Sequence, residues 1–155
     1  MNIEIREAEE IELEQVIVLY GQIGMDNGQP LSIDKGKRIF QHMKAYPDYR
    51  LYMAHYNGII VGAFALLIMD NFAHLAAPSA IIEDVVVHKD WRGRRIGWRM
   101  MAFAMDVSRE KGCYKMVLSS NQSRESAHRF YESMGFQRHG YSFTVDLNLS
   151  ESYAA

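Results

Sequence analysis

A run of arginines and glycines between Arg92 and Gly97 is the part of this sequence best suited to bind a ligand. It follows an apolar segment, Val85–Val87, and the turn is expected to open a helix. The start of a helix presents unpaired backbone N–H groups and the positive end of the helix dipole, and both attract phosphate oxygens. Only one acid, Asp90, accompanies the basic residues here, although the whole chain has a net charge of −2. The spacing predicts a diphosphate site; the alternative is a solvated basic turn before an ordinary helix.

A second pattern lies downstream, where Asn121 precedes Ala127, Phe130 and Tyr131. The spacing of the last three places them on one face of a helix. Gly135 is the residue type favoured just past a helix end. The small Ala127 permits close packing while the Tyr131 hydroxyl projects from the helix. The alternative is a core tyrosine whose hydroxyl is satisfied within the protein.

Both patterns resemble signatures of the GNAT superfamily of N-acetyltransferases. The segment Arg92–Gly97 is similar to its acetyl-CoA loop, Arg/Gln-x-x-Gly-x-Gly/Ala, and Asn121–Phe136 is similar to its second signature, Asn followed by Ala-x-x-Phe-Tyr-x-x-x-Gly-Phe. One position departs from the loop motif, because Arg95 stands where glycine is usual. An arginine is acceptable there if its backbone dihedrals are helical. The resemblance covers about residues 81–147.

The resemblance implies transfer of an acetyl group from acetyl-CoA to a primary amine by direct attack on the thioester. Ile82–Val87 is similar to glucosamine-phosphate N-acetyltransferases, whereas Ala127–Tyr131 is similar to aminoalkylphosphonate N-acetyltransferases. Both favour a small-molecule amine, but they point to different ones. Two other functions stay open: acetylation of a protein N-terminus or lysine, and a noncatalytic acyl-CoA-binding sensor on the same fold.

The resemblance also implies roles for individual residues. Glu83 lies among apolar residues, which raise a carboxyl pKa and suit it to act as the general base; the alternative is a rim carboxylate that only binds the amine. Strand alternation directs Asp84 to the opposite face, so it is the weaker candidate. Tyr131 is the expected acid for the coenzyme A thiolate, because a phenol pKa of about 10 exceeds a thiol pKa of about 8.5. Backbone N–H of the strand stabilises the oxyanion and pairs with pantetheine. The expected cofactor-binding residues are Val85, Val86, Val87, Arg92, Gly93, Arg94, Arg95, Ile96, Gly97, Trp98, Asn121 and Tyr131.

The elements that position these residues follow from hydrophobic periodicity and turn chemistry. Strands are expected at about residues 3–6, 50–55, 59–69, 80–87, 114–119 and 141–149, with one more short strand at 136–138. Helices are expected at about 11–20, ended by Gly21 or Gly24, and at 32–46, 97–111 and 123–133, and a loop at 26–30. Asn57-Gly58 is the preferred pair for a tight hairpin turn, and a crossover helix makes its flanking strands parallel. The order predicts a mixed α/β protein with the GNAT fold: a mostly antiparallel sheet with a parallel splayed strand pair, flanked by about four helices.

Composition bounds the remaining expectations. The 155 residues suit a single acetyltransferase domain, and the small net charge gives no reason to expect nucleic acid or a membrane as partner. One cysteine, Cys113, permits no intrachain disulfide, and no signal peptide is recognisable, so a cytoplasmic protein is expected. The six histidines lack metal-ligand spacing, so no metal is expected. The amine and the oligomeric state stay open, although homodimers are common in the superfamily.

Overall fold

The computed structural model describes residues 1–23 and 29–145 and divides the chain into two compact units. The first unit is Met1–Leu118 and the second is Ser119–Ala155. Gly24, the expected loop at 26–28 and the part of the expected last strand beyond residue 145 lie outside the described residues.

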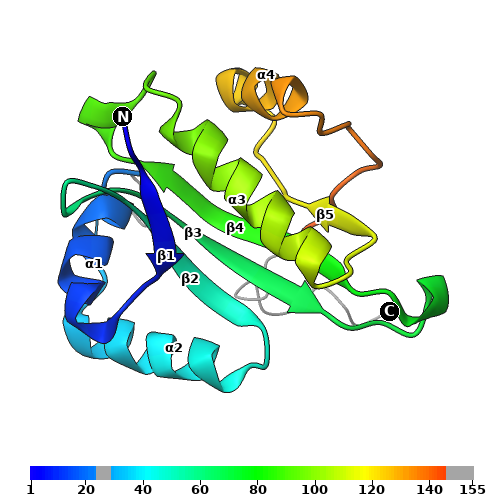
Figure 1. Cartoon of the computed structure of the whole chain (residues 1–155), viewed down its shortest axis with the longest axis horizontal. Helices are drawn as coiled ribbons and strands as arrows, with labels where there is room; N and C mark the ends of the chain where they lie inside the picture. Colours follow the sequence, from blue (N-terminus) through cyan, green and yellow to red (C-terminus); the bar gives the residue numbers. More distant parts are fainter. Residues whose placement is uncertain (24–28, 146–155) are drawn as a thin grey trace. The chain divides into compact units, whose positions relative to one another are not determined.

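The first unit is built on a five-stranded sheet with the strand order β1-β2-β3-β4-β5 (Figure 1). The first three pairings are antiparallel, and β4 pairs with β5 in parallel, as the crossover helix predicts. Asn57 and Gly58 join β2 to β3 with φ values of 48° and 77°, which confirms the tight turn with two left-handed residues. The strands are β1 (Glu4–Glu7), β2 (Tyr49–Tyr56), β3 (Ile59–Met69), β4 (Ser79–Val87) and β5 (Lys115–Val117).

The described residues form four α-helices. The helices of the first unit are α1 (Leu13–Gly21), α2 (Ile33–Ala45) and α3 (Ile96–Glu110), and that of the second unit is α4 (Glu125–Ser133). The 3₁₀ turns are η1 (Glu10–Glu12), η3 (His74–Ala76) and η4 (Lys89–Trp91). The Ser32 hydroxyl caps α2 by accepting a hydrogen bond from the Lys35 N–H at 3.4 Å. No helix within the described residues is long and apolar enough to cross a membrane.

Both faces of the sheet carry apolar side chains, because helices pack on each of them. On one face, Leu51 and Met53 of β2 belong to a buried cluster with side chains of α1 and α2. On the other, Tyr52 stacks on Phe64 with ring centroids 5.3 Å apart and meets the edge of Phe103 from α3 at 5.2 Å. The period-2 alternation of β2 therefore separates a layer facing α1 and α2 from a layer facing α3.

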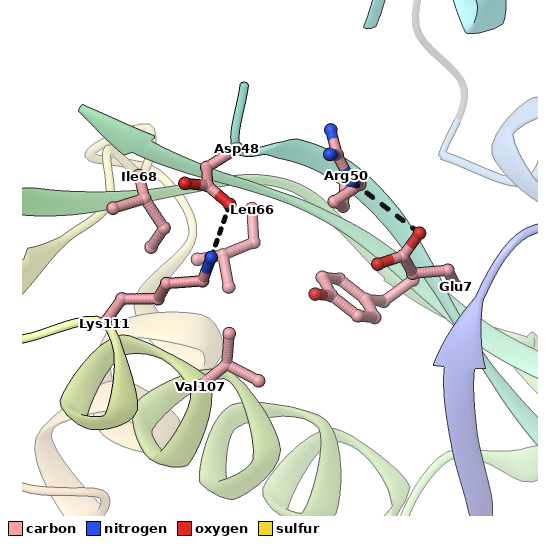
Figure 2. Close-up of a pocket in the computed structure, with 8 residues that line it drawn as sticks. Glu7, Asp48, Arg50, Leu66, Ile68, Val107 and Lys111 are labelled. Carbon is pink, nitrogen blue, oxygen red and sulfur yellow. Dashed lines mark hydrogen bonds and ion pairs between the residues drawn. The ribbon is translucent and has the colours of Figure 1, made fainter. Parts of the chain in front are cut away.

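A hollow of about 190 Å³ lies between the sheet and the C-terminal end of α3 (Figure 2). Two ion pairs line it: Lys111 Nζ lies 2.7 Å from Asp48 Oδ1, and Arg50 Nε lies 3.7 Å from Glu7 Oε2. Because each cation on its wall already has an acidic partner, the hollow offers no unpaired charge to an anionic ligand.

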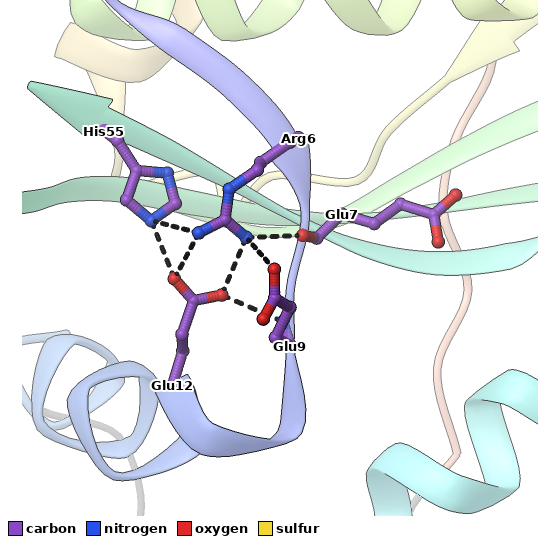
Figure 3. A network of polar contacts seen from close by, with 5 residues as sticks. All are labelled: Arg6, Glu7, Glu9, Glu12 and His55. Carbon is purple, nitrogen blue, oxygen red and sulfur yellow. Dashed lines mark hydrogen bonds and ion pairs between the residues drawn. The ribbon is translucent and has the colours of Figure 1, made fainter. Parts of the chain in front are cut away.

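A polar network joins β1, the start of α1 and β2 (Figure 3). The Arg6 guanidinium donates to both carboxylate oxygens of Glu12, at 2.9 and 2.7 Å, and His55 Nε2 lies 2.9 Å from Glu12 Oε1. The Glu9 N–H donates to the same carboxylate at 2.9 Å. Burial alone would raise the pKa of Glu12, but the hydrogen bonds from Arg6, Glu9 and His55 outweigh it and lower the pKa to about 2.

The strands expected at 136–138 and from residue 141 onward are not formed within the described residues, which corrects those two expectations. Residues 136–139 and 141–145 have no regular secondary structure, and Tyr141 and Phe143 are about nine-tenths exposed. Alternation creates a strand only where a neighbouring strand satisfies its backbone. The described part of the second unit contains one helix and no strand that could do so.

Candidate functional site

The turn after β4 presents the start of α3 without a side-chain cap. The chain passes through η4 and Gly93, which has a φ of 76°, and reaches the helix at Ile96 with Arg95 at its N-cap position. No side chain of the described residues accepts a hydrogen bond from this first turn. The N–H groups of Ile96, Gly97 and Trp98 are therefore available for an anion, as the sequence pattern predicts.

Arg95 differs from the expected conformation, because its backbone is left-handed. Its φ is 59° and its ψ is 16°. The right-handed helical dihedrals expected for Arg95 are therefore not observed. Glycine adopts the left-handed conformation without steric cost, whereas other residues adopt it at a cost of roughly 1–2 kcal/mol. The usual glycine of the motif is explained by this conformation, and Arg95 adopts it despite its side chain.

The arginines of the turn lack acidic partners. Within the described residues no carboxylate forms an ion pair with Arg92, Arg94 or Arg95, and the nearby Asp90 lies 3.9 Å from His88 Nδ1. Arg92 Nε donates to the Val87 carbonyl at 3.3 Å. The turn is therefore an exposed concentration of positive charge beside uncapped amides, which is the electrostatic complement of a polyphosphate.

One edge of β4 is left without a strand partner over most of its length. The parallel ladder with β5 comprises three pairs, from Ser79 with Lys115 to Ile81 with Val117. Within the first unit, no strand pairs with the β5-side edge of Ile82–Val87, so the two strands diverge after Ile81. An edge of this kind can accept another extended chain through main-chain hydrogen bonds.

A β-bulge interrupts β4 at Asp84. Glu83 pairs with Ala65 and Val86 pairs with Ala63, so two residues of β4, Asp84 and Val85, oppose one residue of β3. Asp84 has a φ of 53°. The expectation that Asp84 faces away from Glu83 rested on strand alternation, and because alternation does not continue through a bulge, it stays a prediction. Bulges also disrupt the ladder and re-aim side chains, and they are common next to active sites.

Glu83 lies on the sheet face that packs on α1 and α2, because its ladder partner is two positions from Ala63 of that buried cluster. Burial and the neighbouring Asp84 charge raise the pKa of Glu83. Burial and the Asp84 charge also raise the pKa of Tyr20 and Tyr49. Two carboxylates and two phenols therefore share one electrostatic neighbourhood, where a positively charged amine would be stabilised.

Asn121 and Tyr131 belong to the second unit and are described within it. The Asn121 side-chain oxygen accepts hydrogen bonds from the Ser123 N–H and hydroxyl at 2.9 and 2.8 Å, which fixes the turn before α4. Tyr131 is half-buried in α4, and its ring contacts those of Phe130 and Phe136 at 5.3 and 5.7 Å. Within the first unit, Glu83 and Val85–Val87 lie on β4, and the turn 92–98 follows directly and leads into α3.

Two residues of the candidate site were missed by sequence reasoning. The Gln22 side chain, just after α1, accepts a hydrogen bond from the Lys89 N–H at 3.0 Å and thereby holds the start of the basic turn. Tyr56 of β2 packs on Trp91 with ring centroids 5.1 Å apart. Both contacts join residues more than thirty positions apart, and no local pattern in the sequence indicates them.

Other reactive residues do not join the site. Burial and the charge of Asp48 raise the pKa of Cys113, which disfavours the nucleophilic thiolate. Among residues 1–23 and 29–145 no group of three His, Cys, Asp or Glu side chains is placed to hold a metal ion.

A model of one protein family matches most of the chain. Residues 19–136 match the acetyltransferase (GNAT) family. The chain belongs to the GNAT acetyltransferase family. It is an enzyme, an acetyl-CoA-dependent N-acetyltransferase, and the expectation drawn from the two motifs is confirmed. The predicted fold class is confirmed as well, in the mixed α/β sheet with its parallel β4–β5 pair.

Individual GNAT proteins are similar over most of the chain. A glucosamine 6-phosphate N-acetyltransferase from Trypanosoma brucei brucei is 30% identical over 148 residues, which are 95% of this chain and 97% of that protein. An aminoalkylphosphonate N-acetyltransferase from Salmonella typhimurium is 34% identical over 101 residues, 65% of each chain. The solved structure of a putative acetyltransferase from Agrobacterium tumefaciens has a TM-score of 0.85 and 30% identity, covering 92% of this chain and 99% of that one.

Proposed function

We propose that this GNAT protein transfers the acetyl group of acetyl-CoA to the primary amine of a small molecule, by direct attack of the amine on the thioester. The observation that carries the proposal is the juxtaposition of an unpaired β4 edge with a basic, uncapped helix start. The amides of Ile96–Trp98 hold the diphosphate, and the main chain of Val85–Val87 pairs with the pantetheine arm. The thioester is thereby directed along β4 toward Glu83.

The acceptor amine must lose a proton before it can attack. An alkylammonium has a pKa near 10.4, so most of the amine is protonated at neutral pH. Glu83 acts as the general base, directly or through water, and its raised pKa brings it closer to the working pH than an ordinary carboxylate. The N–H of Val86 or Val87 stabilises the oxyanion that forms, because no strand of the first unit pairs with the β5-side edge of this part of β4.

The leaving group is the thiolate of coenzyme A. Tyr131 donates the proton that it takes up, and Asn121 hydrogen-bonds the pantetheine arm. Both residues are in the second unit, so the mechanism requires the two units to act as one acetyltransferase domain. The family match supports this, because residues 19–136 span the boundary between Leu118 and Ser119.

The names of the relatives restrict the class of acceptor amine that we propose. Those named above act, by their names, on glucosamine 6-phosphate and aminoalkylphosphonates, which are small amines that carry an anionic phosphorus group. We propose an acceptor of this class.

The test is an assay of thiol release from acetyl-CoA. The purified protein is incubated with glucosamine 6-phosphate, aminomethylphosphonate, glucosamine, free amino acids and lysine-containing peptides, and the product is identified by mass spectrometry. Turnover with a small amine supports the proposal, and turnover restricted to peptides replaces it with protein acetylation. Tight acetyl-CoA binding without turnover on any acceptor would make the protein a sensor.

A further inference from the structure

The loop between β3 and β4, residues 70–78, carries two large apolar side chains that lie entirely in solvent. Phe72 and Leu75 have exposed fractions of 108% and 102%. Single exposed apolar side chains are ordinary, but several that protrude together from one short loop are typical of a surface that another molecule covers. The β3–β4 loop is therefore a candidate interaction surface.

The backbone of this loop is strained and fixed. Its 3₁₀ turn, His74–Ala76, is left-handed throughout, with φ values from 54° to 63°, although it contains no glycine. The Asn71 side-chain N–H donates to the Ala77 carbonyl at 2.6 Å, and the His74 ring stacks on Tyr114 with centroids 4.1 Å apart. Strain of this kind persists only where surrounding contacts impose it, and it is common where a segment binds. The loop thus holds its apolar side chains outward in one conformation, which lowers the entropic cost of association.

The apolar surface continues from the loop onto the end of the sheet. Met69, the last residue of β3, and Val117 of β5 are both exposed. The register places Met69 level with Ser79 and Ser79 level with Lys115, so Met69 and Lys115 point to the same face of the sheet. Val117 shares that face by strand alternation. We call Met69, Phe72, Leu75 and Val117 the apolar patch.

One charge of each sign borders the apolar patch. Asp70 follows β3 and Lys115 begins β5, and both side chains are exposed. Neither forms an ion pair with any residue that the structure describes, and β4 lies between the two strands that carry them. In a contact with two-fold symmetry a surface meets its own copy, so each acid can face the base of the other protomer. A second copy of this chain therefore complements both charges, which a partner of one sign would not.

We propose that the apolar patch is a homodimer interface, in which the β3–β4 loop of each protomer packs on the sheet end of the other. Phe72 and Leu75 form the buried centre of the contact. Asp70 of one protomer pairs with Lys115 of the partner subunit at the rim. A two-fold contact is closed, so assembly stops at the dimer. The inference does not depend on the proposed acetyl transfer, because neither Glu83 nor the basic turn takes part.

The first experiment measures the dimer dissociation constant of the full chain by sedimentation velocity over a range of protein concentrations. The wild type is expected to form dimers. Phe72→Ala and Leu75→Ala are each expected to raise the dissociation constant about tenfold or more, because side chains at the centre of an interface carry most of its affinity. Ile11→Ala is the matched control, since it removes an exposed apolar side chain from η1, and it should leave the constant unchanged. The thermal midpoint of each variant checks that the fold is retained.

The second experiment tests the two-fold arrangement by charge reversal. Asp70→Lys alone and Lys115→Glu alone each place like charges opposite one another, so both are expected to weaken the dimer. The double variant restores two opposite-charge pairs across the interface and is expected to recover most of the lost affinity. Recovery in the double variant separates a direct contact from a general effect of each substitution on the fold.

Three results would overturn the inference. The first is a wild type that stays monomeric at every concentration, and the second is a dimer that both Phe72→Ala and Leu75→Ala leave intact. The third is a dimer that Ile11→Ala dissociates while the loop variants do not, which would place the interface on another surface. A double charge variant that stays as weak as the single variants would overturn the pairing of Asp70 with Lys115 of the partner subunit.

Discussion

Glu83 and Val86 point to the same face of β4, although a three-position step would place them on opposite faces of a regular strand. Their ladder partners, Ala65 and Ala63, are two positions apart on β3, so one extra residue is accommodated in β4. Asp84 makes this possible with a left-handed backbone. The bulge therefore places the Glu83 carboxylate on the same face as the Val86 side chain, next to the strand amides proposed to bind the oxyanion.

The first prediction concerns the pH dependence of this carboxylate. If Glu83 is the base, kcat/KM falls as the pH drops through its pKa, which lies above the ordinary value of about 4.3. Asp84→Asn removes a neighbouring negative charge, so ionised Glu83 becomes more favourable and the acid limb moves to lower pH. Asparagine tolerates the left-handed backbone, so the bulge is retained. The pH profiles of kcat/KM for the wild type and Asp84→Asn, measured with the same amine, isolate the shift in the Glu83 pKa, because titration of the amine affects both profiles equally.

Glu83→Gln completes that experiment. It is expected to lower kcat by about 10²–10⁴-fold and to abolish the acid limb. Glu110→Gln, an exposed change at the end of α3, should behave as the wild type. If Glu83→Gln raised KM and left kcat unchanged, Glu83 would only bind the amine.

The second prediction concerns the acid. Tyr131→Phe is expected to lower turnover by about 10²-fold, because proton donation to the thiolate is lost, while acetyl-CoA affinity measured by calorimetry changes little. Tyr141→Phe in the same unit is the matched control, since Tyr141 is exposed. An unchanged rate in Tyr131→Phe removes this residue from the acid role.

The third prediction concerns the left-handed N-cap. Arg95→Gly is expected to raise the free energy of unfolding by up to about 1 kcal/mol, because glycine relieves the strain of a positive φ at a smaller cost in unfolded-state entropy. Arg95→Val should lower it, since a β-branched residue is disfavoured there. Arg99→Gly, the same change inside the helix, should cost about 1 kcal/mol. Urea unfolding curves test all three, and equal losses for glycine at 95 and 99 would contradict the left-handed assignment.

The fourth prediction concerns acid stability. The folded-state pKa of Glu12, about 2, is below its unfolded value, so its contribution is present above about pH 4.5 and is lost as the pH falls toward 2. After allowance for solvent screening this contribution is on the order of 2 kcal/mol at neutral pH. Glu12→Gln should therefore be less stable at pH 7 and should lose less stability than the wild type between pH 6 and pH 3. The exposed variant Glu14→Gln is the reference. If the free energy of unfolding had the same pH dependence in the wild type and in Glu12→Gln, Glu12 would not contribute to acid stability.

The fifth prediction concerns a buried hydroxyl. The Tyr20 hydroxyl is buried without a hydrogen-bond partner among the described residues. Removing an unsatisfied polar group does not cost a hydrogen bond, so Tyr20→Phe should leave the stability unchanged or raise it by about 1 kcal/mol. A loss of more than about 1 kcal/mol would mean that the hydroxyl is satisfied in solution.

The sequence predicted the elements whose determinants are local. The Asn57-Gly58 turn and the Ser32 cap depend on residues that are neighbours in the chain. Of the two glycines expected to end the first helix, Gly21 is the last residue of α1. The extent of β3, Ile59–Met69, was predicted to the residue, because a long apolar run is bounded by a turn on one side and by polar residues on the other.

The features that escaped prediction depend on contacts or on strain. The bulge at Asp84 is set by the register between β3 and β4, and an aspartate in a strand does not indicate it. A left-handed turn has positive φ values from 54° to 63° at His74, Leu75 and Ala76, and no glycine in the sequence indicates it. The roles of Glu83 and Tyr131 stay predictions, because they concern chemistry that the fold alone does not reveal.

The hydrogen bond from the Lys89 N–H to the Gln22 side chain has a practical consequence for protein engineering. It connects the end of α1, which packs on the sheet face that carries Glu83, to the loop proposed to hold the cofactor. Libraries that vary α1 to change the amine would therefore disturb cofactor affinity at the same time, unless the residue at 22 is kept constant.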